Sequence, residues 1–228
     1  MNIQILQLLE GAQEASGLTV IIDVFRAFST ACYAFERGAE KIIPVGNIET
    51  AYRLKKEHPE FLLAGERNER MPEGFDFGNS PARLNGHLKG KTIVHTTSSG
   101  TQGIVNATGA DEIITGSFVN AGAIVRYIKI QNPGTVSLVC MGYACEFSTD
   151  EDTLCAEYIK NELEGDPNHF AKMVEIIRMG SGARFFEPES QEYAPKDDFG
   201  LCLNLNHFNF VLKAEQNDGM YNLRKINV

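Results

Sequence analysis

Asp23 stands directly after an apolar segment, residues 20–22, that is typical of a buried strand. A carboxylate in that position can cap the next helix, but Ser29 and Thr30 lie nearer the expected start of that helix and can cap it instead. Asp23 is then available as a metal ligand or a general base. Enzymes of the haloacid-dehalogenase type, which form a covalent aspartyl phosphate, need a second aspartate two positions later, and this chain has Phe25 there. A covalent mechanism is therefore disfavoured.

Arg26 and a hydroxyl-rich run, Ser98 to Thr101, are the candidate anion-binding groups. The planar guanidinium of Arg26 suits a phosphate or a sulfonate, although an ordinary surface salt bridge would also explain an arginine beside an aspartate. The run Ser98 to Thr101 resembles a loop whose N–H groups meet a phosphate at a helix N-terminus, and a plain Ser/Thr helix cap is the alternative. The Gly-x-x-x-x-Gly-Lys spacing of a P-loop is absent, so nucleotide hydrolysis has no support.

Acidic side chains supply the candidate metal ligands. Glu66 and Asp76 lie in a long irregular stretch, and long ordered loops are often functional. Glu151 and Asp152 come before an expected helix, where the helix dipole also favours acids. The five histidines show no ligand spacing, which argues against zinc, whereas a carboxylate-rich site suits Mg²⁺. In open α/β sheets ligands bind beyond the carboxyl ends of the strands, where these polar residues are expected.

The elements that must position these residues show a repeat. The pattern of Gly38-Ala39 followed by Ile42-Ile43 recurs as Gly109-Ala110 followed by Ile113-Ile114. It predicts two similar βαβαβ units and an α/β fold class, with mostly parallel or mixed sheets covered by helices in three α/β/α layers. We expect residues 1–85 to form the first unit and residues 86–228 the second unit plus a C-terminal extension, with the site in the crevice between the units.

The C-terminal end is less regular. Residues 153–163 and 170–179 are predicted to be helices, and residues 186–198 a polar loop. Residues 201–205 and 208–212 are compatible with two strands, or with a short helix and one strand.

Composition limits the class of protein. The chain has 228 residues, a formal net charge of −9 and 43% hydrophobic residues, so it has enough apolar residues for a packed core and is not disordered. The acidic balance argues against binding to nucleic acid or membrane surfaces. No uncharged apolar run approaches the roughly 20 residues of a membrane helix, and the N-terminal residues alternate like a strand rather than a secretory signal. Five widely spaced cysteines with no Cys-x-x-Cys pair are typical of a reduced, cytoplasmic protein.

Several blocks of the sequence, in order, resemble the 2-phosphosulfolactate phosphatase family. The blocks cover most of residues 19–160: Asp23-Val24-Phe25-Arg26-Ala27-Phe28-Ser29-Thr30, Gly65-Glu66-Arg67, Glu73-Gly74-Phe75-Asp76-Phe77-Gly78-Asn79-Ser80-Pro81, Gly90-Lys91-Thr92-Ile93-Val94-His95-Thr96-Thr97, Gly116-Ser117-Phe118-Val119-Asn120-Ala121, and Phe147-Ser148 with Glu151-Asp152 and Cys155-Ala156. The resemblance implies a magnesium-dependent acid phosphatase that converts (R)-2-phospho-3-sulfolactate to sulfolactate and phosphate. It also implies a role in coenzyme M biosynthesis and an α/β fold unlike the common phosphatase folds.

The chain departs from the family pattern at a few places. The family usually has Asn where this chain has Ser99, and one extra residue lies between Ser148 and Glu151. The C-terminal third matches weakly, chiefly at Ser181 and around residues 198–202. A non-catalytic binding module for an anionic metabolite, a transferase, or a phosphatase for another small phosphorylated acid are the alternatives.

The resulting assignment is a metal-assisted hydrolase of a small anionic phosphorylated substrate, with Mg²⁺ as cofactor and water as nucleophile. No nucleic acid or membrane partner is expected, and a homodimer is left open. The expected catalytic residues are Asp23, Arg26, Glu66 and Asp76. The expected substrate-binding residues are Ser29, Thr30, Arg67, Asn79, Ser80, Thr97, Ser98, Ser99, Gly100 and Thr101, with Arg67 assigned to the sulfonate or carboxylate. The expected metal ligands come from Asp23, Glu66, Asp76, Glu151 and Asp152.

Overall fold

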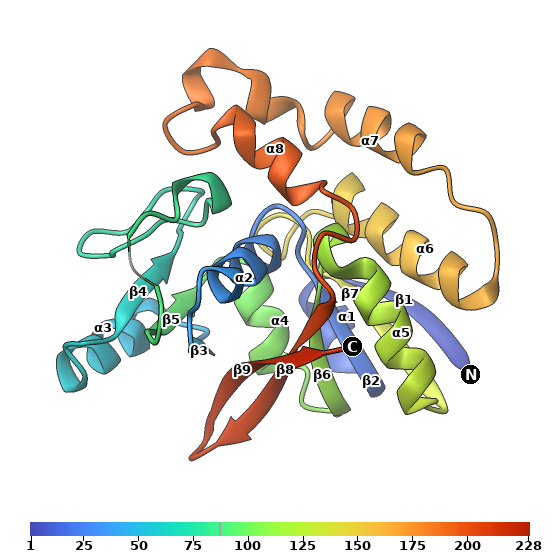
Figure 1. The fold of residues 1–228 in the computed structure, drawn as a ribbon, viewed down its shortest axis with the longest axis horizontal. Coiled ribbons are helices and arrows are strands. Elements are labelled where there is room, and N and C mark those ends of the chain that lie inside the picture. The colour runs from blue at the N-terminus through green and yellow to red at the C-terminus, as the bar shows by residue number, and fades with distance from the viewer. Residues whose placement is uncertain (87) are drawn as a thin grey trace.

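The computed structural model describes residues 1–86 and 88–228 and contains a nine-stranded sheet with helices on both faces (Figure 1). The strand order is β1-β7-β2-β6-β8-β9-β3-β5-β4. The strands are β1 (Asn2–Gln7), β2 (Gly17–Ile22), β3 (Lys41–Pro44), β4 (Leu62–Gly65), β5 (Thr92–Thr96), β6 (Ala110–Gly116), β7 (Thr135–Cys140), β8 (Phe210–Asn217) and β9 (Met220–Asn227). The α-helices are α1 (Leu8–Glu14), α2 (Ala27–Glu36), α3 (Ile48–Glu57), α4 (Gly100–Asn106), α5 (Ala121–Gln131), α6 (Asp150–Glu164), α7 (Phe170–Met179) and α8 (Lys196–Cys202).

Two parallel groups of strands make up most of the sheet. The strands β1, β7, β2 and β6 run parallel to one another, and so do β3, β5 and β4. The antiparallel hairpin β8–β9 joins the two groups by pairing with β6 on one side and β3 on the other. The α/β class with a mostly parallel sheet is thus confirmed.

The strands of the two sequence repeats alternate in space. The strand β2, which begins the first repeat, lies between β7 and β6 of the second repeat. The strand β5, which begins the second repeat, lies between β3 and β4 of the first. Each parallel group therefore contains one strand from one repeat and two from the other. The boundary at residue 85 between two units stays a prediction.

Both faces of the central strands are buried, as expected for parallel strands between helices. Along β2, Val20 and Ile22 pack in a cluster with α5 and α6, whereas Ile21 packs on the opposite face with α1, α2 and α4. Successive side chains of a strand point to opposite faces of the sheet, so helices pack on both faces and form the three layers. The helix α2 is buried from Ala27 to Phe35, so it is covered on all sides rather than on one face.

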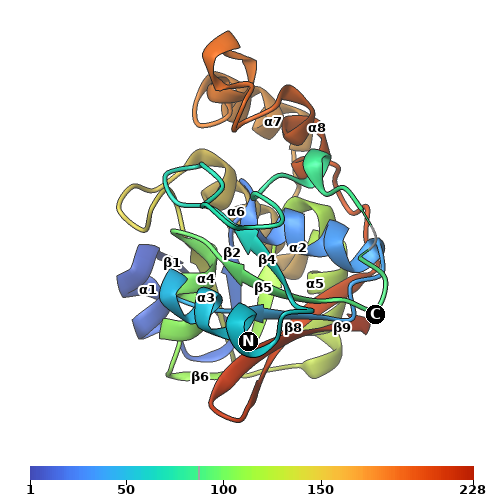
Figure 2. The same ribbon diagram turned by 90° about the vertical axis from the view of Figure 1, so that its left-hand side faces the viewer.

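The segment 166–202, here called the C-terminal cap, covers α2 and α6 at the carboxyl end of β2. The cap contains α7, α8 and two short 3₁₀ helices, Ala183–Phe186 and Pro188–Ser190. Figures 1 and 2 both place α7 and α8 above the helical layer rather than in it. Residues expected to form only a polar loop thus include helical turns.

At the far C-terminus the structure shows a short helix and a strand, the second of the two predicted alternatives, followed by one more strand. Residues 196–202 form α8, and the chain then forms the hairpin β8–β9, whose second strand was not anticipated. In residues 1–86 and 88–228, no helix is long and apolar enough to cross a membrane. All five cysteines are unpaired.

Candidate active site

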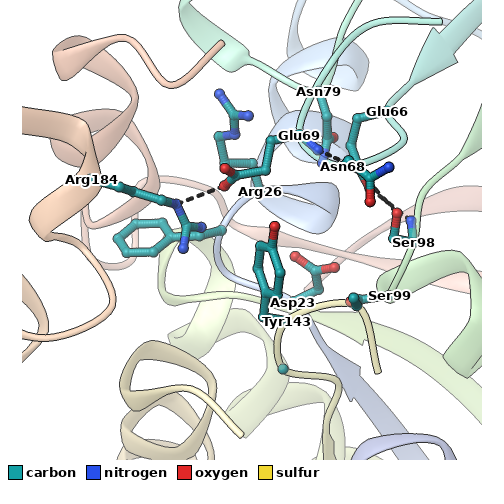
Figure 3. A pocket seen from close by; sticks show the side chains of 13 residues that line it. Asp23, Arg26, Glu66, Asn68, Glu69, Asn79, Ser98, Ser99, Tyr143 and Arg184 are labelled. Atoms are coloured by element: carbon teal, nitrogen blue, oxygen red, sulfur yellow. Dashed lines mark hydrogen bonds and ion pairs between the residues drawn. The ribbon is translucent and has the colours of Figure 1, made fainter. Parts of the chain in front are cut away.

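A pocket lies where the carboxyl ends of β2, β4, β5 and β7 approach one another under the C-terminal cap (Figure 3). The strands of both repeats supply its walls. Six of the sequence-predicted site residues line it: Asp23, Arg26, Glu66, Asn79, Ser98 and Ser99.

Asp23 is held at the end of β2 with only 4% of its surface exposed. Its Oδ1 accepts a hydrogen bond from the backbone N–H of Ala27, in the first turn of α2, at 3.0 Å. Burial raises the pKa of Asp23 to about 7, and the nearby charges of Glu66 and Glu151 add to that rise, while the N–H groups of Ala27 and Gly100 oppose it. Asp23 thus lies close to two other acidic groups, Glu66 and Glu151.

Gly100, at the start of α4, allows this close approach. A Cβ atom at Gly100 would lie 2.7 Å from Oδ2 of Asp23 and 2.8 Å from the Cβ of Ala27. Neither distance is compatible with a side chain, so glycine lets the α4 backbone contact Asp23.

Glu66 follows β4 and is fixed by three donors. The N–H of Ser98 donates to Glu66 Oε1 at 2.7 Å, and the N–H of Glu69 and the hydroxyl of Ser98 donate to Oε2 at 2.8 and 3.2 Å. The loop that the sequence predicts to hold an anion therefore directs one N–H at Glu66, and a second, from Gly100, at Asp23. In this structure these N–H groups position carboxylates.

Glu151 and Asp152 are buried just behind the pocket. Asp152 accepts hydrogen bonds from the N–H groups of Val24 and Gly142, both at 2.8 Å, and so joins the ends of β2 and β7. Glu151 accepts a hydrogen bond from the hydroxyl of Ser181 in the cap. Burial raises the pKa of both carboxyl groups. The charges of Glu151 and Asp23 raise the pKa of Asp152 further. At Glu151 the positive charge of Arg184 opposes the rise in pKa.

Arg26 forms a buried ion pair that the sequence did not indicate. Its Nη1 lies 2.7 Å from Oδ2 of Asp198 in α8, and the two side chains are 4% and 0% exposed. Asp198 Oδ1 also accepts hydrogen bonds from the Ser80 hydroxyl and the Ala82 N–H, at 2.8 and 3.0 Å. In Figure 3 the guanidinium of Arg26 points away from Asp23. Because Asp198 lies in α8, the Arg26–Asp198 ion pair joins the C-terminal cap to the turn that carries Asp23.

Arg184 is the second cation of the pocket wall, and sequence reasoning missed it. Its Nε lies 2.9 Å from Oε1 of Glu69, and its guanidinium lies over the rings of Phe25, Tyr143 and Phe185. Arg184 comes from the cap, far along the chain from the strand ends, in a segment with no pattern that marks it. Only the fold brings it to the pocket.

Other sequence-predicted residues lie outside the pocket lining. Asp76 accepts a hydrogen bond from the N–H of Leu63 at 2.8 Å and pairs with Lys55 at 3.4 Å. The guanidinium of Arg67 donates to the carbonyl of Glu66 at 2.7 Å and to the hydroxyl of Thr96 at 2.8 Å. Ser29, Thr30, Ser80, Thr97, Gly100 and Thr101 are buried behind the pocket surface. The roles assigned to these residues stay predictions.

The described residues contain no preformed cluster of three or more histidine, cysteine or acidic side chains that could hold a metal. Mg²⁺, however, is commonly bound by one or two carboxylates together with substrate phosphate and water. Asp23 and Glu66 supply two carboxylates that line one pocket. The donor set therefore fits a Mg²⁺ ion that shares its coordination with substrate.

Comparison with known proteins gives concordant matches. A family model described as 2-phosphosulpholactate phosphatase matches residues 3–217. A protein of Caldanaerobacter subterraneus subsp. tengcongensis is 35% identical over 215 residues, covering 86% of this chain and 87% of the relative. One of Bacillus subtilis is 30% identical over 213 residues and 92% of each chain, and one of Thermotoga maritima is 42% identical over 158 residues and 67% of each. All three relatives are named "Probable 2-phosphosulfolactate phosphatase".

Proposed function

Since the chain belongs to the 2-phosphosulfolactate phosphatase family, we propose that it hydrolyses (R)-2-phospho-3-sulfolactate to 3-sulfolactate and phosphate with Mg²⁺ as cofactor. The observation that carries the proposal is the set of acidic groups around Asp23. They lie at the carboxyl ends of the strands, where α/β proteins bind ligands, and Asp23 and Glu66 line one pocket there.

The charges of the pocket support a requirement for a cation. Asp23, Glu66 and Glu69 line it, and its two guanidinium groups are already paired with Asp198 and Glu69. A phosphate ester would add further negative charge. Asp23 and Glu66 would hold the Mg²⁺. When bound, the ion would offset charge on the phosphoryl oxygens and lower the pKa of a bound water molecule.

The protein's own groups would hold the substrate and the carboxylates in place. Ser99 Oγ accepts a hydrogen bond from the N–H of Cys145 at 3.2 Å, so its own proton is free to be donated to a phosphoryl oxygen. The three donors on Glu66 and the Ala27 N–H on Asp23 keep both carboxylates oriented. Water attacks the phosphorus atom, the ester P–O bond breaks, and the alcohol leaves with the proton from water.

Variants of the two carboxylates test this assignment. Asp23→Asn and Glu66→Gln should each lower phosphate release by about a hundredfold or more while the circular dichroism spectrum stays unchanged. Asp111→Asn is the matched control, because Asp111 is an exposed residue of β6 that does not line the pocket. Wild-type turnover by a folded Asp23→Asn protein would show that Asp23 has no part in the reaction.

The resemblance also leads to finer expectations that belong to the same proposal. They are a role in coenzyme M biosynthesis and a cytoplasmic location. The family resemblance supports the first, and the five unpaired cysteines support the second.

A further inference from the structure

Arg184 lies on the wall of the pocket opposite Ser98 and Ser99. Figure 3 shows its guanidinium on one side, Ser98 and Ser99 on the other, and Asp23 and Tyr143 between them. A substrate whose phosphoryl group meets Asp23 and Ser99 would therefore extend its remaining atoms toward Arg184.

The other arginines near the pocket are engaged elsewhere. Arg26 forms a buried ion pair with Asp198. Arg67 donates hydrogen bonds to the Glu66 carbonyl and the Thr96 hydroxyl. Arg184 pairs with Glu69 through Nε and donates from Nη1 to the Ser181 carbonyl at 3.2 Å, but the Arg184 and Glu69 side chains remain 20% and 19% exposed. A ligand in the pocket can therefore reach these two side chains, whereas the Arg26–Asp198 pair is buried.

Aromatic rings hold the Arg184 guanidinium. It lies 5.2 Å from the ring centroid of Phe185, 5.8 Å from that of Phe25 and 5.9 Å from that of Tyr143. Phe25 and Phe185 pack edge to face with centroids 4.7 Å apart. These rings restrict the Arg184 side chain and lower the local dielectric constant, which strengthens the hydrogen bonds of its guanidinium to an acid group.

We propose that Arg184 is a specificity-determining residue that binds the second acid group of the substrate, the sulfonate or carboxylate carried next to the phosphate ester. Glu69 balances its charge in the free pocket and gives up part of that contact when the substrate's acid group binds. This inference rests on the proposed function. It transfers the role predicted for Arg67 to a residue of the C-terminal cap.

The test is a panel of small phosphate esters that carry a carboxylate, a sulfonate or no second acid group. 2-Phospholactate carries a carboxylate, the phosphate ester of 2-hydroxyethanesulfonate carries a sulfonate, and ethyl phosphate carries neither. Arg184→Gln should lower kcat/KM about thirtyfold for the ester whose acid group Arg184 binds, mainly through KM, and change ethyl phosphate less than about threefold. Arg184→Lys should recover part of the loss, because lysine restores the positive charge but cannot form the bidentate hydrogen bonds of a guanidinium. Glu69→Gln should lower KM for the same ester.

Arg178→Gln is the matched control. Arg178 is in the same cap, with its guanidinium 4.4 Å from the ring centroid of Phe186, and it does not line the pocket. This variant should match wild type on all three esters.

An equal loss on all three esters would overturn the proposal, since it would mean that Arg184 holds the cap or the phosphoryl group. No loss on any ester would overturn it as well. Calorimetric binding of 3-sulfolactate separates this inference from the proposed function, because it needs no turnover. Binding weakened about thirtyfold by Arg184→Gln would support the Arg184 site even in an inactive wild-type enzyme, and binding unchanged by the substitution would overturn it.

Discussion

Replacing Asp198 with asparagine should strongly destabilise the protein, because the change leaves a buried guanidinium without its counterion. Asp198 Oδ2 faces Arg26 at 2.7 Å, and both side chains are sealed from water. An asparagine oxygen could still accept the hydrogen bonds from Ser80 and Ala82, but its NH₂ group would face the guanidinium, donor against donor.

The magnitude follows from this geometry. Breaking a buried ion pair by removing one partner typically costs about 3–5 kcal/mol, a large part of the roughly 5–15 kcal/mol that holds a domain folded. Urea unfolding followed by circular dichroism measures the change. Glu57→Gln is the control: it breaks the Arg53–Glu57 pair in α3, whose side chains are 57% and 50% exposed, and should cost no more than about 0.5 kcal/mol.

A double-mutant cycle makes the test specific. Arg26→Met removes the buried charge, so combining it with Asp198→Asn should cost less than the sum of the two single changes by at least about 2 kcal/mol. Phosphate release should fall in Asp198→Asn as well, because Arg26 adjoins the turn that holds Asp23. An Asp198→Asn protein within about 1 kcal/mol of wild type, or strictly additive changes, would refute the structural role given to this pair.

Two further predictions concern a buried histidine and a close backbone contact. Burial, with the Arg67 charge, lowers the pKa of His95 from 6.5 to about 4, so the unfolded chain takes up a proton first as the pH falls. The free energy of unfolding should then decrease by up to roughly 3 kcal/mol between pH 6.5 and pH 4. This dependence of stability on pH should be much weaker in His95→Gln. It should persist in His169→Gln, the control, because His169 is exposed. Equal pH slopes in wild type and His95→Gln would count against a neutral buried His95. Gly100→Ala should lower turnover at least about tenfold and stability by about 1–3 kcal/mol, because the new Cβ would overlap Asp23 and Ala27. Gly134→Ala is the control. A Cβ at Gly134 meets no atom within 4 Å, so this variant should leave phosphate release unchanged. A fully active Gly100→Ala enzyme would show that Asp23 and α4 need not lie so close.

The sequence predicted the fold class and part of the pocket, since both depend on local patterns. Apolar runs that end in polar residues indicate strands of an α/β sheet, and the carboxyl ends of such strands gather at a ligand site. That reasoning brought Asp23, Glu66 and Ser98 together, and in the structure all three line one pocket. The family resemblance is confirmed by the comparisons.

What the sequence did not predict depends on contacts between distant segments. Arg184 and Asp198 reach the site only through the packing of the C-terminal cap, and nothing in the local sequence separates Arg184 from an ordinary surface arginine. The hairpin β8–β9 lies between the two parallel groups of strands, a position that no local pattern specifies. Asp76 and Arg67 fit the expected chemistry as well as Asp23 does, yet hydrogen bonds with Leu63 and Thr96 hold them elsewhere.

The most direct test of the proposed function is release of inorganic phosphate from (R)-2-phospho-3-sulfolactate by the wild-type enzyme, with EDTA and then with excess Mg²⁺. Three carboxylates line the pocket and both of its guanidinium groups are already paired, so the phosphate needs an added cation. We predict that EDTA abolishes the release and that Mg²⁺ restores it. Full turnover in excess EDTA would contradict the metal-assisted mechanism, and no release under either condition would contradict the proposed substrate.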